Sequence, residues 1–275
     1  IAPAIAGIVE HLTVFQRTAQ WMFPNPMYHD EVGDGVRWAM RHLPYYGRWY
    51  RFLLLWPGAD KGLDAARADP DYADRDYAVS DINAAARMMF SQWITSQVDE
   101  GSDLLTKVMP DYPATGKRTL QDNGSWLKTL QRDNVELVRT PIERITPGGI
   151  VTEDGVTHEV DIIVYATGFR HTDVLWPLKI SGRNGIDLHE LWGRRPFAHL
   201  GITVPGFPNL FLVYGPGTHL AHGGSLIFQS ELQMRYINLC LQHMAEDHIV
   251  ALEPTAEAAE QWHQRTQAEI KQMVW

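Results

Sequence analysis

A cation and a hydroxyl stand together at the end of a predicted strand. Residues 2–10 predict a short helix, and the β-branched and aromatic run Leu12–Gln16 predicts a strand that ends before Arg17 and Thr18. In a dinucleotide-binding βαβ unit, the residue after the second strand faces the adenosine ribose, and a carboxylate there favours NAD. An arginine instead offers planar, permanently charged donors for a phosphate, which favours NADP. A solvated arginine after an edge strand accounts for the same residues equally well.

Lys117 and Arg118 form a second group of cations, directly after Gly116. Successive side chains of an extended segment point in opposite directions, so Lys117 would meet one anion and Arg118 another. A solvated turn is the simpler interpretation of these residues alone.

Two further segments combine apolar runs with glycine. Asp161–Phe169 predicts a buried strand over Val160–Tyr165 that enters a tight turn at Gly168, although a strand-to-loop corner without function explains it too. Asn209–Tyr214 predicts a buried strand that ends at the glycine-rich turn Gly215-Pro-Gly217. A long helix predicted from about Gly224 to Met244 follows, and its free N–H groups would suit an anion or an electron-rich carbonyl.

No metal site or nucleophile is predicted. His219 and His222 fall in a predicted loop without a third ligand, so we reject a metal. Cys240 lies in an apolar helical stretch and is expected to be a small buried hydrophobic residue.

The remaining pattern separates a helical block from segments with strands. Residues 20–114 contain a loop at Trp21–Pro26 and then helical patterns without a strand signal, at Val36–Met40, Tyr46–Trp56 and Val79–Glu100. Strands are expected at Val135–Val138 and Gly149–Thr152, followed by a hairpin turn at Asp154–Gly155. A last helix is expected within Pro254–Met273.

The composition is that of a globular protein. The chain has 275 residues, of which 45% are hydrophobic and 21% charged, and its formal net charge is −9. This charge argues against a nucleic-acid groove or an anionic membrane face. No apolar run approaches the roughly 20 residues of a membrane span. The single cysteine excludes a disulfide within the chain and favours a reducing, cytoplasmic compartment.

Taken in order, these segments resemble Baeyer–Villiger monooxygenases. The resemblance covers essentially the whole chain and rests on Phe15–Thr18 with Trp21, Gly116–Arg118, Val160–Phe169, Phe207–Phe211 and Gly215–Ser225. Met109–Arg118 and Thr119–Gly124 look most similar to the hydroxyacetophenone monooxygenase branch. The Ala166–Phe169 signature is shared with other class B flavoprotein monooxygenases, whereas Lys117-Arg118 in this context is more specific.

The resemblance implies an α/β fold with two Rossmann-like dinucleotide-binding domains, of which the chain would carry only part. Residues 1–19 and 115–168 would belong to an NADP-binding domain, 20–114 to a helical insertion and 169–275 to the FAD-binding domain. The family's two Gly-x-Gly-x-x-Gly turns and the fingerprint segment between them are expected before Ile1, and a final stretch after Trp275. The chain by itself is therefore expected to be inactive and to bind FAD weakly.

The resemblance also implies roles for individual residues. Arg118 would be the catalytic residue beside the flavin. Cofactor binding would involve Arg17, Thr18 and Lys117 at the 2′-phosphate of NADP, Ala166, Thr167, Gly168 and Phe169 at the link between the domains, and Gly215, Gly217, Gly224 and Ser225 at FAD. The substrate pocket would include Ala221, His222 and Gly223.

The implied reaction inserts one oxygen atom of O2 next to a ketone carbonyl and gives an ester or lactone, with NADPH as reductant. A fixed arginine is the expected partner for the negative charge that develops when reduced flavin reacts with O2, because it does not give up its proton. The aromatic residues of 21–56 favour aryl ketones, unless they only form a core. Oxygenation of nitrogen or sulfur centres is an alternative within class B, and a non-catalytic helical binding module is an alternative of another class. The oligomeric state stays open.

Overall fold

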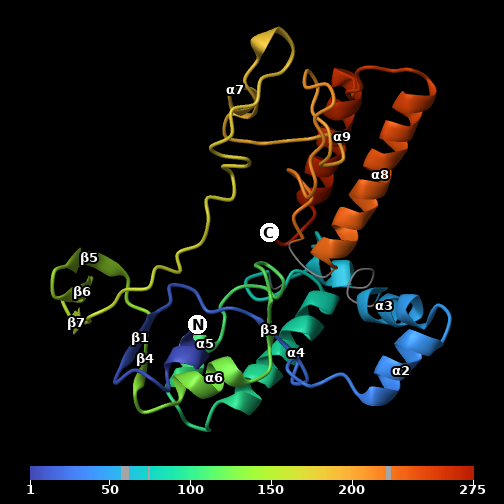
Figure 1. The fold of residues 1–275 in the computed structure, drawn as a ribbon. Helices are drawn as coiled ribbons and strands as arrows, with labels where there is room; N and C mark the ends of the chain where they lie inside the picture. The colour runs from blue at the N-terminus through green and yellow to red at the C-terminus, as the bar shows by residue number, and fades with distance from the viewer. Residues whose placement is uncertain (57–61, 74, 221–223) are drawn as a thin grey trace. The chain divides into compact units, whose positions relative to one another are not determined.

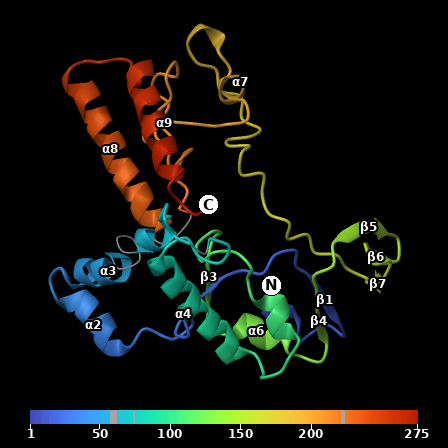
Figure 2. The ribbon, with the colours of Figure 1, turned by 180° about the vertical axis from the view of Figure 1, so that it is seen from behind.

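The computed structural model describes residues 1–56, 62–73, 75–220 and 224–275, and it divides into two compact units (Figures 1 and 2). Unit 1 contains Ile1–Phe52, Leu63–Ala166 and Val274–Trp275, and unit 2 contains Leu53–Gly62 and Thr167–Met273. None of the described helices is long and apolar enough to cross a membrane.

The strands of unit 1 form three small sheets. Strand β1 (Leu12–Phe15) pairs in parallel with β4 (Val135–Val138), with Leu12 opposite Val135. Strand β2 (Met22–Pro24) pairs in parallel with β3 (Leu120–Asp122). Strands β5 (Ile142–Thr146), β6 (Gly149–Thr152) and β7 (Thr157–Glu159) form an antiparallel sheet. The strands predicted from Leu12, Val135 and Gly149 are thereby confirmed.

The predicted helical block, residues 20–114, contains α2 (Asp34–His42), α3 (Tyr46–Trp56), the short 3-10 helix η2 (Gly62–Ala66), α4 (Asp81–Gln97) and α5 (Leu104–Val108). Two further helices lie outside this block, α1 (Ala2–Ile5) before it and α6 (Ser125–Leu130) after it. The start of α4 is set by Ser80, whose hydroxyl accepts a hydrogen bond from Asn83 N.

The core of unit 1 joins α4 and α6 to the strands. Trp21, Ile94 and Leu127 are each fully buried, and they belong to one apolar cluster with Phe90 and Leu137. Both views show α4 beside α6 and β3 (Figures 1 and 2). This packing ties the predicted insertion to the strands on either side of it.

Unit 2 contains η3 (Arg183–Gly185), α7 (Leu188–Trp192), α8 (Leu226–Glu246) and α9 (Ala256–Ile270). Its core gathers Leu188, Trp192, Ala198, Val204, Phe207 and Leu212. The side chains of Ser225 and Thr255 cap α8 and α9, which confirms the two long helices predicted near the end of the chain.

Two predicted buried strands are wrong. Val160–Tyr165 is extended chain without a partner among the described strands, and Ile162, Val164 and Tyr165 are exposed (Figure 1). A strand needs a neighbour for its N–H and C=O groups, and apolar content alone does not provide one. In Asn209–Tyr214 the end residues have φ values of 61° and 57°, which a strand does not allow.

Other expectations need smaller corrections. Trp21–Pro26, expected as a loop, contains β2, whose Pro24 is tolerated at the end of an edge strand. Strands β3, β5 and β7 were not expected at all. The hairpin turn between β6 and β7 is confirmed, with Gly155 at φ 83°. Cys240 is only partly buried.

Ile94→Ala tests the contribution of α4 to this core. The substitution removes a fully buried side chain and leaves a cavity, so we expect a loss of about 2–5 kcal/mol in unfolding free energy. Urea denaturation monitored by tryptophan fluorescence would measure it. Met88→Ala, at an exposed position of the same helix, is the control and should change stability far less; equal losses would contradict the assigned core.

Candidate cofactor and active site

The exit of β1 carries the first pair of predicted residues. Arg17 is exposed and Thr18 partly buried, one and two residues after the backbone N–H of Gln16 closes the ladder with Val138 O at 3.0 Å. Arg139, directly after β4, donates to Arg17 O at 3.3 Å and to Lys107 O at 3.0 Å. The two chain segments that leave the carboxyl ends of this parallel pair are therefore linked, in the position where α/β folds bind dinucleotides.

A cavity of about 250 Å³ lies at the same end of β4. Its lining combines cations, carboxylates and a histidine with apolar side chains: Lys107, Glu136, Leu137, Val138, Arg139, Thr140, Asp154, Val156 and His158. Thr152 and Val156 donate hydrogen bonds to Asp154, and the Thr152 hydroxyl is the largest cause of the lowered pKa of this carboxyl. Asp154 thus stabilises the β6–β7 turn through these two hydrogen bonds.

The second cation group is joined to the exit of β1 through Tyr112. The Tyr112 hydroxyl donates to Ala19 O at 3.0 Å, and the indole N–H of Trp21 donates to Tyr112 O at 3.0 Å. The ammonium of Lys117 lies 4.7 Å from the centre of the Tyr112 ring. Arg17 and Lys117, far apart in the sequence, therefore belong to loops that share one anchor.

Helix α4 fixes the turn that carries Lys117 and Arg118. The fully buried Asn83 amide donates to Ala65 O at 2.6 Å and to Ala114 O at 2.7 Å. Arg87, one turn later, donates to Tyr112 O at 3.0 Å, and its guanidinium lies 5.0 Å from the Trp21 ring centre. Sequence reasoning missed Asn83, Arg87 and Tyr112. For Asn83 and Arg87, the sequence does carry a signal, since a polar and a charged residue stand among the apolar residues Ile82–Phe90.

The residues at this end of unit 1 fit a phosphate-bearing dinucleotide. Arg17, Thr18 and Lys117 supply two cations and a hydroxyl, and Arg118, also exposed, extends the basic turn. Beside them, the side-chain oxygen of Gln16 is buried and has no hydrogen-bond partner within the described residues. A buried acceptor of this kind is suited to a donor from a bound molecule.

Ala166–Phe169 is an exposed stretch at the boundary between the two units, which falls between Ala166 and Thr167. Gly168 has φ 91° and open space around it, so its backbone conformation alone explains the glycine. Phe169 is 99% exposed.

In unit 2, the glycines of the predicted flavin loop have separate structural reasons. A Cβ on Gly215 would lie 2.4 Å from Gly201 O, so this position requires close backbone approach. Gly217 and Gly224 have positive φ values of 81° and 73°. Ser225 uses its hydroxyl to cap α8, accepting from Phe228 N at 3.3 Å.

The predicted substrate residues Ala221, His222 and Gly223 lie outside the described residues. The ring of His219 lies 5.1 Å from that of Tyr214, between centroids. Among the described residues, no three His, Cys, Asp or Glu side chains form a group that would hold a metal ion.

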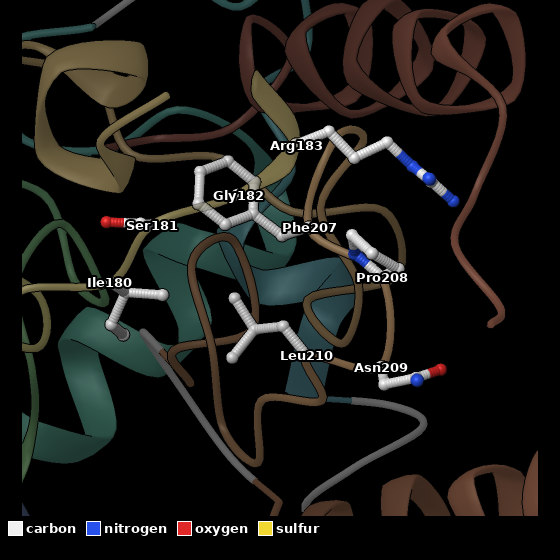
Figure 3. Close-up of a pocket in the computed structure, with 8 residues that line it drawn as sticks. All are labelled: Ile180, Ser181, Gly182, Arg183, Phe207, Pro208, Asn209 and Leu210. Carbon is white, nitrogen blue, oxygen red and sulfur yellow. The ribbon is translucent and has the colours of Figure 1, made fainter. Parts of the chain in front are cut away.

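A larger cavity of about 430 Å³ lies within unit 2 and contains none of the predicted site residues (Figure 3). It is lined by Ile180, Ser181, Gly182, Arg183, Phe207, Pro208, Asn209 and Leu210. Arg183 pairs with Glu253 at 2.5 Å, and Glu253 also accepts from Gly206 N at 2.6 Å. These contacts tie the segment before α9 to the cavity wall, so the cavity has a structural explanation and no evident reactive group.

The comparisons with known proteins identify monooxygenases as relatives of this chain. No protein-family model matches the chain. It is 37% identical over 276 residues to the uncharacterized monooxygenase y4iD of Sinorhizobium fredii, covering 100% of this chain and 42% of that protein. It is 30% identical over 273 residues to a Baeyer–Villiger monooxygenase of Pseudomonas aeruginosa, covering 99% and 49%.

Solved structures give the same result. The chain is similar to oxidized steroid monooxygenase bound to NADP, with a TM-score of 0.75, 27% identity and coverage of 99% of this chain and 56% of that one. It is also similar to OTEMO in complex with FAD and NADP, with a TM-score of 0.75, 25% identity and coverage of 100% and 55%. The chain thus spans about half the length of these relatives. The predicted α/β fold is confirmed, because the chain corresponds to about half of each of these monooxygenase structures.

Glu253→Gln tests the contact that closes the wall of the larger cavity. The hydrogen bond from Arg183, with a further one from Gly206 N, holds the pKa of Glu253 below its ordinary value of 4.5. A carboxylate whose pKa falls on folding stabilises the fold above its unfolded pKa and loses that effect as the pH falls through the folded pKa. We expect the variant to melt at a lower temperature at pH 7, with the difference shrinking as the pH drops below about 4.5.

Melting curves of the variant and the unchanged protein across this pH range would measure the effect. Glu246→Gln is the matched control, because Glu246 is exposed and accepts its hydrogen bond from the neutral Gln242. A pH-independent difference for Glu253→Gln would show that the ionised pair is not the cause.

Proposed function

We propose that the protein is an NADPH- and FAD-dependent Baeyer–Villiger monooxygenase, which inserts one oxygen atom of O2 next to a ketone carbonyl to give an ester or lactone. The observation that carries this proposal is the anchoring of the Lys117-Arg118 turn to the exit of β1 through Tyr112. This anchoring joins the loop of Arg17 to the turn of Lys117 and Arg118 at the carboxyl ends of a parallel strand pair. Dinucleotides bind at such an edge in α/β folds, and the cations would suit their phosphate groups. The similarity to monooxygenases, including structures that contain FAD and NADP, supports the same assignment.

For NADPH, we assign the 2′-phosphate to Arg17, Thr18 and Lys117. Arginine binds phosphate through paired N–H groups, while lysine provides a compact charge. No carboxylate stands next to Arg17 to bind the free 2′-hydroxyl of NADH. The unpartnered oxygen of Gln16 would accept a donor from the same ligand.

For FAD, we assign Gly215, Gly217, Gly224 and Ser225. We assign Ala166, Thr167, Gly168 and Phe169 to cofactor binding as the link between the two dinucleotide-binding domains. The backbone N–H groups at the start of α8 present the positive end of a helix dipole. Ser225 lies at this end as the residue that caps the helix. We place substrate contacts at Ala221, His222 and Gly223.

Arg118 is the proposed catalytic residue. A bound flavin, reduced by NADPH, would supply the activation of O2, with one oxygen atom entering the ketone and the other leaving as water. Arg118 supplies a permanent positive charge where negative charge develops on oxygen, and it keeps its proton throughout. A lysine at this position would be able to lose its proton, which explains the use of arginine.

The finer identity is also a proposal. The run Met109–Arg118 favours the hydroxyacetophenone monooxygenase branch, and exposed aromatic rings at Trp38, Tyr45 and Trp49 favour aryl ketones as substrates. The single cysteine favours the cytoplasm. Oxygenation of nitrogen or sulfur centres would use the same cofactors, whereas a non-catalytic binding module would leave the gathered cations unexplained.

Arg118→Ala tests the catalytic assignment in the FAD-loaded protein encoded by the full reading frame. We expect the variant to consume NADPH but to lose ester formation by about 10²- to 10³-fold, because a fixed charge at the reacting oxygen is missing. Gas chromatography of an aryl ketone reaction would quantify the ester, and peroxide release would report oxygen that is reduced without insertion.

Lys128→Ala, which removes an exposed cation from α6, is the control and should leave ester formation unchanged. A parallel assay with a sulfide separates the alternatives. Normal ester formation by Arg118→Ala would refute the role of Arg118, and oxidation of the sulfide alone would favour the heteroatom-oxygenating alternative.

Arg17→Ala tests the choice of NADPH. Loss of a charge-assisted hydrogen bond to the 2′-phosphate should weaken NADPH binding by about 10- to 100-fold and leave NADH binding nearly unchanged. Titration of each cofactor by fluorescence gives the two dissociation constants. Equal weakening of both cofactors would point to a general structural effect and against phosphate recognition.

A further inference from the structure

We infer that Tyr112 is a positioning residue for cofactor selectivity, because it holds the loop of Arg17 and Thr18 and the turn of Lys117 at a fixed separation. This inference rests on the proposed binding of the NADPH 2′-phosphate by those residues. Tyr112 itself need not touch the cofactor.

The contacts of Tyr112 with the first loop are short and partly buried. Its hydroxyl donates to Ala19 O at 3.0 Å, and Ala19, two residues after Arg17, is 2% exposed. Its carbonyl oxygen accepts from the indole of the fully buried Trp21 at 3.0 Å, and the two rings meet edge to face. Tyr112 therefore binds both ends of Ala19–Trp21, the segment through which the Arg17 loop enters β2.

The hydroxyl keeps this contact at neutral pH. Burial is the largest cause that raises the pKa of the Tyr112 phenol above its ordinary value of 10.0, and the nearby charge of Asp111 acts in the same direction. The phenol therefore remains a protonated donor to Ala19 O under ordinary conditions.

Tyr112 contacts Lys117 with the face of its aromatic ring. The Lys117 ammonium lies 4.7 Å from the ring centre, a distance at which a cation is attracted to an aromatic face. Between Tyr112 and Lys117, the chain is held by the Asn83 amide on Ala114 O and by the Thr115 hydroxyl on Ala65 O. Arg87 adds a second hydrogen bond to Tyr112 O. The backbone at residues 112–115 is thus held by α4 and η2, and the Tyr112 ring restricts the end of the Lys117 side chain.

Such restriction matters for phosphate recognition in particular. Lysine is a point charge on a flexible four-carbon stem, so its contribution to binding depends on how much side-chain freedom is already lost. A tether between the two cation-bearing loops prepares both charges for one phosphate group. It contributes nothing to a cofactor that lacks the 2′-phosphate, so selectivity is the property it controls.

The test compares NADPH and NADH binding to Tyr112→Phe and Tyr112→Leu in the FAD-loaded protein encoded by the full reading frame. Dissociation constants come from fluorescence titration, without turnover. Tyr112→Phe keeps the ring over Lys117 and removes the donor to Ala19 O. We expect the preference for NADPH over NADH to fall about 2- to 10-fold, as for one lost hydrogen bond, and to fall further in Tyr112→Leu.

Tyr77→Phe is the matched control. Tyr77 also provides a ring for Arg87, 5.0 Å from its guanidinium, and it is an exposed tyrosine. We expect this variant to retain the original ratio of dissociation constants, whatever it does to the melting temperature.

A double-mutant cycle of Tyr112→Leu with Lys117→Ala shows whether Tyr112 acts through Lys117. If Tyr112 acts through Lys117, the double variant should lose less NADPH affinity than the sum of the losses in the two single variants. Equal weakening of NADPH and NADH, or a lower melting temperature with an unchanged ratio, would overturn the positioning role. If Arg17→Ala and Lys117→Ala lower the preference for NADPH while both Tyr112 variants retain it, the positioning role of Tyr112 is refuted and the proposed NADPH site stands. If neither Arg17→Ala nor Lys117→Ala changes the preference, the proposed NADPH site and the role of Tyr112 are both refuted.

Discussion

The hydrogen bond from the Trp21 indole to the Tyr112 carbonyl, 91 residues apart in the sequence, is the interaction on which the arrangement of unit 1 depends. Trp21 is fully buried and packs with Phe90 and Ile94 of α4, so its donor needs a partner inside the core. The carbonyl of Tyr112 is that partner, and Arg87 donates to the same oxygen. Around this point the exit of β1, the insertion helix α4 and the cation turn meet.

This contact gives the helical insertion a part in the proposed chemistry. Asn83 and Arg87 of α4 hold the backbone that precedes Lys117 and Arg118, although neither would need to contact a cofactor. A polar side chain as deeply buried as Asn83 is stable only with its hydrogen bonds made, and two of its partners are backbone carbonyls of other segments. Helix α4 therefore holds the backbone that leads to the proposed catalytic arginine.

The exposed apolar chain of Val160–Phe169 shows the opposite situation. Its residue types are those of a buried strand, yet strand structure requires a neighbouring backbone, and none of the described strands offers one. The chain spans about half the length of its relatives, so the fold described here is also a part of theirs. Within unit 2, local contacts and a long-range contact act together: Ser225 and Thr255 cap the long helices, and the Arg183–Glu253 pair joins segments 70 residues apart at the wall of the cavity.

Residue types and local patterns were enough to predict several elements and the kinds of chemistry available. Helical patterns predicted α4, α8 and α9, because such a pattern repeats over a few neighbouring residues. Arg17, Lys117 and Arg118 indicated anion binding, because the charge of each side chain can be read from the sequence without knowing its neighbours in space. The long-range contacts were needed to show that β1 pairs with β4, that Tyr112 joins the two cation-bearing loops, and that Val160–Tyr165 pairs with none of the described strands. Each of these depends on which distant segment supplies a hydrogen-bond partner, and hydrophobic pattern along the chain carries no information about that partner.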